Sequence, residues 1–211
     1  MLGTLFVISA PSGAGKTSLV SALVETTPGV ELSVSHTTRP QRSGEIDGVH
    51  YHFTTAGQFS AMVDDALFLE HARVFDNQYG TARAPVEDRL HMGNDLVLEI
   101  DWQGARQVRR AMPEVVSIFI LPPSREELER RLRSRGQDAD AVIARRMRAA
   151  VDEMSHHDEY DYLVVNEVFE DAVAELRAII LSRRLRGPVQ RERYRSMLEA
   201  LIRPGSASLG I

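Results

Sequence analysis

The sequence predicts an α/β protein in which helices cover both faces of a central parallel sheet. Four short apolar runs are continuous rather than alternating, as in strands covered on both faces. They lie at residues 5–8, 96–100, 116–121 and 162–165. Segments with helical spacing lie between or after these runs, at residues 19–24, 105–112, 125–135, 143–154 and 172–185. Strands that alternate with helices along a chain are typical of parallel sheets.

The composition limits the classes of function. The 211 residues are enough for one main core with small inserted lobes, and the formal net charge of −5 argues against general nucleic-acid binding. The chain has no cysteine, which excludes a thiol nucleophile or a disulfide framework. We expect a cytoplasmic protein without a membrane partner, because the sequence has neither a signal-peptide layout at its start nor an apolar run of about 18 residues. Nothing in the sequence indicates the oligomeric state.

A glycine-rich stretch follows the first apolar run. Residues 10–17 match the pattern G-x-x-x-x-G-K-[ST], except that alanine replaces the first glycine. The glycines allow a tight turn, and the helix that follows directs its N-terminal amides at an anion. Lys16 is the only lysine of the chain, and its compact ammonium suits a narrow loop. The alternative is a plain strand–turn–helix corner. We predict a phosphate-binding loop formed by Ala10, Pro11, Ser12, Gly13, Ala14, Gly15, Lys16 and Thr17.

Two arginines indicate a second anion site. Arg39 and Arg42 flank Pro40, which keeps the segment extended, and two guanidinium forks suit one phosphate group. Tyr51 and Tyr79 could add hydroxyl donors. Solvated surface arginines are the alternative. Beside a phosphate-binding loop, such a site is what a phosphotransferase needs for a nucleotide acceptor.

Glu70 is a candidate for reading the acceptor base. It lies among apolar neighbours in the stretch Phe-Leu-Glu-His-Ala, and a carboxylate can accept both adjacent N–H donors of guanine. The hydroxyl groups of Ser35 and Thr81 could assist. A glutamate on an exposed helix face is the alternative.

Glu99 and Asp101 lie at the end of the apolar run at 96–100 and are candidates for the Mg²⁺ shell together with Thr17. Their spacing of two would place both on the same face of a regular strand. One carboxylate could serve the metal through its waters and the other a base amino group or an arginine.

Residues 124–150 are rich in arginine and predict a mobile helical lid. Arg131 and Arg135 are four apart and share a helix face, and Arg146 follows in the next helical stretch. A lid would supply guanidinium groups to the charge that develops on a transferred phosphoryl group. Surface helices with salt bridges are the alternative.

Seven stretches, in collinear order from about residue 3 to residue 185, resemble bacterial guanylate kinases: SAPSGAGKT, SVSHTTRPQRSGEIDGVHYHF, FLEHARVFDNQYGT, LEIDWQGA, IFILPPS, RLRSRGQDADAVIARRM and YDYLVVN. The resemblance implies a P-loop three-layer fold with an inserted GMP-binding lobe and a helical lid. The implied core comprises residues 3–35, 91–123 and 151–185, the lobe 36–90 and the lid 124–150. A C-terminal helix and flexible tail would occupy 186–211.

The resemblance also implies a reaction and its residues. Such an enzyme transfers the γ-phosphoryl group of ATP to GMP, and to dGMP as well, with Mg²⁺. It implies nucleotide contacts by Lys16, Thr17 and Asn166, and lid arginines at 131, 135 and 146. The implied GMP contacts are Ser35, Arg39, Arg42, Tyr51, Glu70, Tyr79, Thr81 and Asp101. The alternatives are a kinase for another nucleoside monophosphate and a non-catalytic binding module of the same fold.

Overall fold

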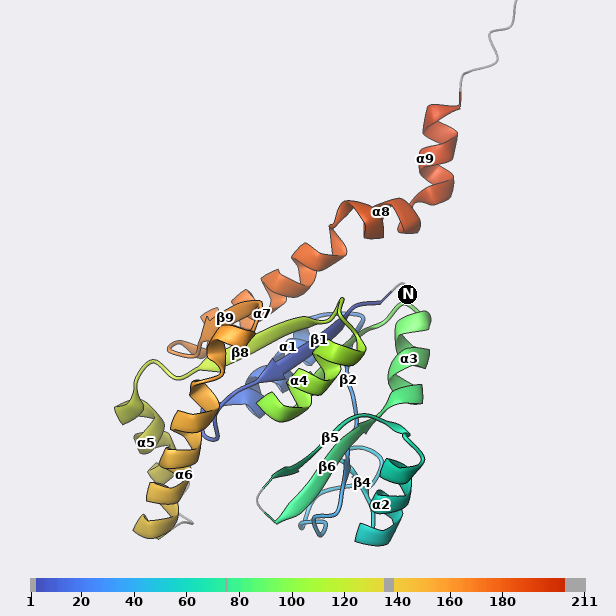
Figure 1. The fold of residues 1–211 in the computed structure, drawn as a ribbon. Coiled ribbons are helices and arrows are strands. Elements are labelled where there is room, and N and C mark those ends of the chain that lie inside the picture. Colours follow the sequence, from blue (N-terminus) through green and yellow to red (C-terminus); the bar gives the residue numbers. More distant parts are fainter. Residues whose placement is uncertain (1–2, 75, 135–138, 204–211) are drawn as a thin grey trace, which may run out of the picture.

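The computed structural model describes residues 3–74, 76–134 and 139–203. Figure 1 shows a central body built on one sheet, a smaller lobe below it, a pair of helices at one side and a C-terminal arm that extends away from the body. The predicted α/β architecture is confirmed.

The large sheet has five parallel strands in the order β2-β7-β1-β8-β9. Four of them are the predicted apolar runs: β1 (Leu5–Ser9), β7 (Asp95–Glu99), β8 (Val116–Leu121) and β9 (Tyr162–Val165). The edge strand β2 (Val30–Leu32) was not predicted, because it has only three residues and buries only Val30. Both β7 and β8 pair with β1, so the chain connections run to opposite sides of β1. At such a point, α/β sheets bind ligands at the carboxyl ends of their strands.

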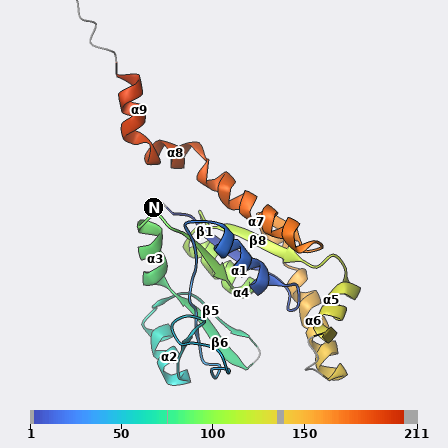
Figure 2. The same cartoon turned by 180° about the vertical axis from the view of Figure 1, so that it is seen from behind.

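Helices cover both faces of this sheet. On one face α1 (Lys16–Thr26) and α7 (Phe169–Arg184) bury Leu19, Leu23 and Leu176 against Phe6 and other strand residues. Figure 2 shows these two helices in front of the sheet. On the other face α4 (Trp102–Ala111) and α3 (Arg83–His91) bury their apolar side chains in a second cluster. The result is the predicted three-layer arrangement.

The lobe contains a second sheet of four strands in the order β4-β3-β6-β5. Its bounds are β3 (His36–Thr37), β4 (His52–Phe53), β5 (Phe68–Val74) and β6 (Asn77–Ala82), with α2 (Ala56–Asp64) packed alongside. Leu69 of β5 packs into the core cluster of α3 and α4, which fixes the β5–β6 hairpin against the body. Although all but the last residue of α3 falls within the predicted lobe 36–90, its Val86 and Leu90 pack in the same cluster of the body.

The two helices at the side are α5 (Arg125–Ser134) and α6 (Asp140–Met154). They form a small core of their own from Leu128, Leu132, Ile143 and Ala150. This pair occupies the segment predicted to be a lid. Arg135 lies outside the described residues.

The C-terminal arm comprises the end of α7, then α8 (Gly187–Arg193) and α9 (Arg195–Ile202). The prediction of a single helix after residue 186 is therefore wrong: two short helices lie there, separated at Tyr194. The predicted flexible tail, residues 204–211, lies outside the described part of the chain. A 3-10 turn at His157–Glu159 follows α6. Among the described residues, none of the helices has the length and apolar character needed to cross a bilayer.

Candidate active site

The glycine-rich stretch forms a tight loop between β1 and α1. Gly13 and Gly15 have φ angles of 95° and 92°, a region that favours glycine over residues with a Cβ. A Cβ at Gly13 would also lie 2.8 Å from Leu132 Cδ2 of α5, so the loop passes close to this helix. Because α1 begins at Lys16, the first amides of the helix belong to the loop. The predicted anion cradle therefore has the backbone that it requires.

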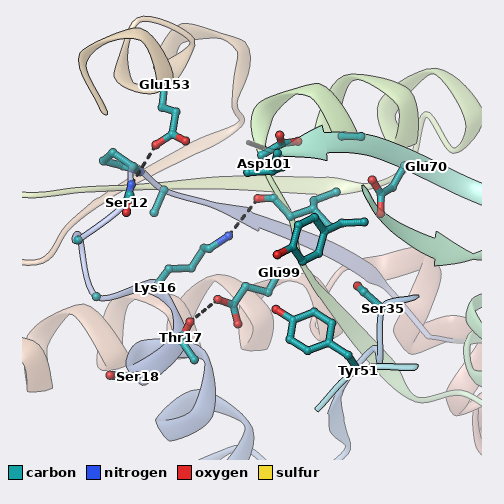
Figure 3. Close-up of a pocket in the computed structure, with 18 residues that line it drawn as sticks. Ser12, Lys16, Thr17, Ser18, Ser35, Tyr51, Glu70, Glu99, Asp101 and Glu153 are labelled. Atoms are coloured by element: carbon teal, nitrogen blue, oxygen red, sulfur yellow. Dashed lines mark hydrogen bonds between the residues drawn. The ribbon is translucent and has the colours of Figure 1, made fainter. Parts of the chain in front are cut away.

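The side chain of Lys16 extends from the loop into a cavity (Figure 3). Its Nζ donates a hydrogen bond to the Ile100 carbonyl at 3.2 Å, at the carboxyl end of the neighbouring strand β7. This contact holds the ammonium between the loop and the end of the sheet, which is where a phosphate bound by the loop amides would meet it.

The side-chain oxygens of Thr17 and Glu99 lie next to each other beside Lys16. The Thr17 hydroxyl donates to Glu99 Oε1 at 2.5 Å. Asp101 does not share a strand face with Glu99, so that expectation is wrong. The strand β7 ends at Glu99, and Asp101 caps α4 by accepting the Gly104 amide at 2.9 Å. A hydroxyl and a carboxylate are hard oxygen ligands of the kind that Mg²⁺ prefers.

Glu70 is a buried carboxylate, with 3% of its surface exposed. It lies on β5 opposite Thr81 of β6, so the alternative of an exposed helix face is wrong. The Thr81 hydroxyl donates to Glu70 Oε1 at 2.6 Å, and Ser35 Oγ lies 3.4 Å from the Thr81 hydroxyl. Burial raises the pKa of Glu70 to about 7, an effect that the Thr81 hydrogen bond opposes. The three predicted base-reading residues therefore form one connected group.

Arg39 is held by a carboxylate that sequence reasoning missed. Its Nη1 and Nη2 donate to Glu45 at 3.1 and 2.7 Å, and Glu45 also accepts the Arg42 amide at 2.8 Å. These hydrogen bonds lower the pKa of Glu45 to about 2, with that of Arg39 as the largest cause. The spacing Arg-x-x-Arg-x-x-Glu was the available sequence signal. The Arg39 guanidinium also lies over the ring of Tyr51, 5.4 Å from its centroid.

Tyr51 lies directly before β4 and Tyr79 lies in β6, and their ring centroids are 6.0 Å apart. Both line the same cavity as Lys16. The Arg42 side chain is exposed, and the structure does not bring it to this cavity. The predicted set of phosphate contacts is thus partly assembled, with Arg39 and the two tyrosines on one side of the lobe.

Two of the predicted lid arginines contact either the loop itself or Asn166, which supports the loop. Arg131 donates from Nη2 to the Asn166 carbonyl at 3.0 Å, and Arg146 donates from Nη2 to Ser12 Oγ at 2.8 Å. Asn166 is buried, and its Nδ2 donates to the Ala14 carbonyl at 2.7 Å. In this structure the Asn166 amide thus supports the loop, and its contact with adenine stays a prediction.

A cavity of about 330 Å³ is lined by the loop and by part of the predicted acceptor site. Among the described residues, the predicted site residues that do not line it are Ala14, Arg39, Arg42, Thr81, Arg131, Arg146 and Asn166. Figure 3 shows loop residues on one side of it and lobe residues on the other, with Glu99 and Asp101 between them. The lining residues named so far are Ala10, Pro11, Ser12, Gly13, Gly15, Lys16, Thr17, Ser35, Tyr51, Glu70, Tyr79, Glu99, Ile100 and Asp101. The predicted phosphate-binding loop and the buried carboxylate of Glu70 therefore line the same cavity.

The guanylate kinase family model matches residues 3–183. This chain belongs to the guanylate kinase family. It is 63% identical over 190 residues to guanylate kinase of Methylococcus capsulatus, which covers 90% of this chain and 92% of that protein. It is 56% identical over 200 residues to guanylate kinase of Chromohalobacter salexigens, with 95% and 93% covered.

Comparison of structures agrees with this assignment. A crystal structure of guanylate kinase from Anaplasma phagocytophilum superposes with a TM-score of 0.76 at 34% identity, covering 93% of this chain and 95% of that one. The protein is a nucleoside monophosphate kinase that transfers the γ-phosphoryl group of ATP to GMP, the reaction of its family. The fold class, the family and the activity predicted from the sequence are confirmed.

Proposed function

We propose that the cavity between the loop and the lobe is where this guanylate kinase aligns ATP and GMP for direct transfer. The observation that carries the proposal is that Lys16 and Glu70 line the same cavity. In-line transfer needs the two nucleotides to meet end to end, because the acceptor oxygen attacks opposite the leaving oxygen. Positioning and electrostatics supply most of the rate, since the protein has little covalent chemistry to perform.

On the donor side, the loop amides and Lys16 bind the phosphates of ATP. Amides at the start of α1 and the ammonium of Lys16 together offset the charge of the β- and γ-phosphates. Arg131 and Arg146 belong to helices that already contact the loop, so a small movement of α5 and α6 would bring both guanidinium groups onto the γ-phosphoryl oxygens.

On the acceptor side, Glu70 accepts the two N–H groups of guanine, and Ser35 and Thr81 orient it. Arg39, Tyr51 and Tyr79 bind the GMP phosphate, and Arg42 joins them when the lobe closes. Asp101 lies between the two halves and contacts GMP from the end of β7. Closure of lobe and lid excludes water that would otherwise hydrolyse ATP. The same pocket accepts dGMP, which presents the same base and phosphate.

Thr17 and Glu99 would hold the Mg²⁺ of the ATP complex. Their adjacent hydroxyl and carboxylate oxygens lie beside Lys16, where the β- and γ-phosphates are expected. When bound, Mg²⁺ supplies positive charge to the phosphate oxygens and so stabilises the transition state. Thr17 would contact the ion, and Glu99 would hold it through water.

The test is a coupled assay of ADP release with AMP, GMP, CMP and UMP as separate acceptors. Wild type should phosphorylate GMP much faster than AMP, CMP or UMP. Lys16→Ala should abolish turnover while GMP binding persists, and Glu70→Gln should reduce the preference for GMP over AMP. Near-normal turnover of Lys16→Ala would contradict the role of the loop, and an unchanged preference in Glu70→Gln would contradict the role of the carboxylate.

A further inference from the structure

The lid helix α6 holds the phosphate-binding loop at Ser12 by two side chains. In its last turn, Glu153 Oε2 accepts a hydrogen bond from the Ser12 backbone amide at 2.9 Å. Two turns earlier, Arg146 donates to the hydroxyl of the same serine at 2.8 Å. Residues seven apart lie on the same face of a helix, so one face of α6 contacts one loop residue at both its amide and its hydroxyl.

The carboxylate of Glu153 is chemically equivalent to a phosphate oxygen at this position. Both are anionic acceptors that form charge-assisted hydrogen bonds with backbone N–H groups. One N–H cannot donate a full hydrogen bond to both acceptors at once. Glu153 also lines the cavity together with Lys16, so it faces the space in which the phosphates of ATP are proposed to bind.

The surroundings of Glu153 disfavour its charged form on balance. Burial is the largest influence and raises its pKa, and nearby Asp101 and Asp152 act in the same direction. The Ser12 amide and the ammonium of Lys16 oppose this shift. The Ser12 amide is therefore held by a partly buried carboxylate, and a phosphate oxygen of ATP can take its place as the acceptor.

We propose that Glu153 competes with the phosphate groups of ATP for the Ser12 amide. ATP must displace the carboxylate from the loop, so Glu153 lowers the affinity for ATP and couples its binding to release of α6. This role deepens the donor-side assignment given above and rests on it. Because the contact is confined to the loop, it leaves the affinity for GMP unchanged.

The experiment is calorimetric titration of ATP with Mg²⁺, and separately of GMP, into wild type and Glu153→Gln. The glutamine keeps the volume and an acceptor oxygen but removes the charge. We expect the dissociation constant for ATP to fall by about tenfold, the size expected when about 1.4 kcal/mol of competition is removed. The constant for GMP should stay within about twofold, a difference of about 0.4 kcal/mol.

Asp152→Asn is the matched control. It removes the same charge from the neighbouring, exposed residue of α6 and leaves the Ser12 contact intact. Only a small change in ATP affinity is expected, so a gain as large as that of Glu153→Gln would assign the effect to general charge and overturn the proposal. Glu153→Ala is the second variant, and its thermal melting curve reports whether it is folded.

The direction of the change in ATP affinity distinguishes competition by Glu153 from a role in shaping the loop. If Glu153 instead shapes the loop for ATP, both variants at this position will bind ATP more weakly, and the proposal is wrong. Unchanged affinity for ATP would equally contradict it. Failure of the proposed function is distinguishable, because wild type itself would then fail to bind ATP or to phosphorylate GMP.

Discussion

The side-chain amide of Asn166 donates to the Ala14 carbonyl at 2.7 Å and so connects the end of β9 to the phosphate-binding loop. Its backbone is fixed to the sheet, since Asn166 N donates to the Leu121 carbonyl at 2.8 Å, and its carbonyl accepts Arg131 of the lid helix α5. One buried residue thus joins the sheet, the loop and α5. The close fit leaves no room for a side chain at Gly15, whose Cβ would lie 2.6 Å from Asn166 Nδ2.

Gly15→Ala is therefore expected to destabilise the protein and to impair ATP binding. The φ angle of 92° alone costs a residue with a Cβ about 1–2 kcal/mol, and the clash with Asn166 adds to it. Urea unfolding should show a lower free energy of unfolding, and titration should show weaker ATP binding with GMP binding retained.

Gly57→Ala is the control for that substitution. Gly57 lies in the first turn of α2, and a Cβ there meets nothing within 4 Å. The change should be neutral or stabilise by up to about 1 kcal/mol, because alanine is the better helix former. Equal effects of the two substitutions would show that the backbone of the loop is not specially constrained.

The loop and the main sheet were predictable from the sequence because each leaves a local pattern. Gly13, Gly15 and Lys16 lie within four residues, and the buried strands are continuous apolar runs. The small sheet of the lobe left no such pattern, since β3 and β4 have two residues each and are stabilised by pairing with distant segments. The contact of Glu153 with Ser12 spans 141 positions and arises only from packing of α6 on the loop.

Binding of GMP should weaken as the pH falls from 8 to 6. The pKa of Glu70 is about 7, so the carboxylate that accepts the guanine donors becomes a neutral acid in this range. An ionised fraction of about one tenth at pH 6 predicts a dissociation constant higher by up to about tenfold. The phosphate of GMP titrates near the same pH, at a pKa of about 6.

Titration of GMP into wild type and Glu70→Gln across this range separates the two effects. The phosphate contributes equally to both proteins, whereas Glu70 contributes only to wild type. The pH dependence should therefore be steeper in wild type. Parallel curves would show that Glu70 does not ionise in the binding range or does not contact the base.

The same carboxylate should make the free protein less stable as the pH rises from about 4.5 to about 7. Its pKa is raised from 4.5 in the folded state, so between these values the folded state binds more protons than the unfolded state. The free energy of unfolding then falls with increasing pH, since stability follows the difference in bound protons. A shift of this size corresponds to at most about 3 kcal/mol.

Urea unfolding of wild type and Glu70→Gln at several pH values measures this contribution as a difference. Glu153, whose pKa is also raised, contributes in the same direction to both proteins and cancels. Relative to the variant, wild type should lose stability across the window. A difference that stays constant with pH would contradict the shifted pKa.

Glu45 is expected to determine how well Arg39 binds the GMP phosphate. Its two oxygens hold both terminal nitrogens of Arg39 and also the Arg42 amide, so it orders the loop that carries both arginines. Glu45→Ala should raise the KM for GMP by about tenfold, because Arg39 is then no longer oriented, while the KM for ATP stays unchanged.

The control is Glu87→Ala, which removes a half-exposed partner of Arg83 on α3, at 3.5 Å. Such exposed pairs contribute little, so its kinetics should match wild type.

The sign of the Glu45 effect discriminates between two roles of that carboxylate. If Glu45 withheld Arg39 from the substrate rather than orienting it, Glu45→Ala would lower the KM for GMP, because the freed guanidinium would reach the phosphate without first breaking two hydrogen bonds.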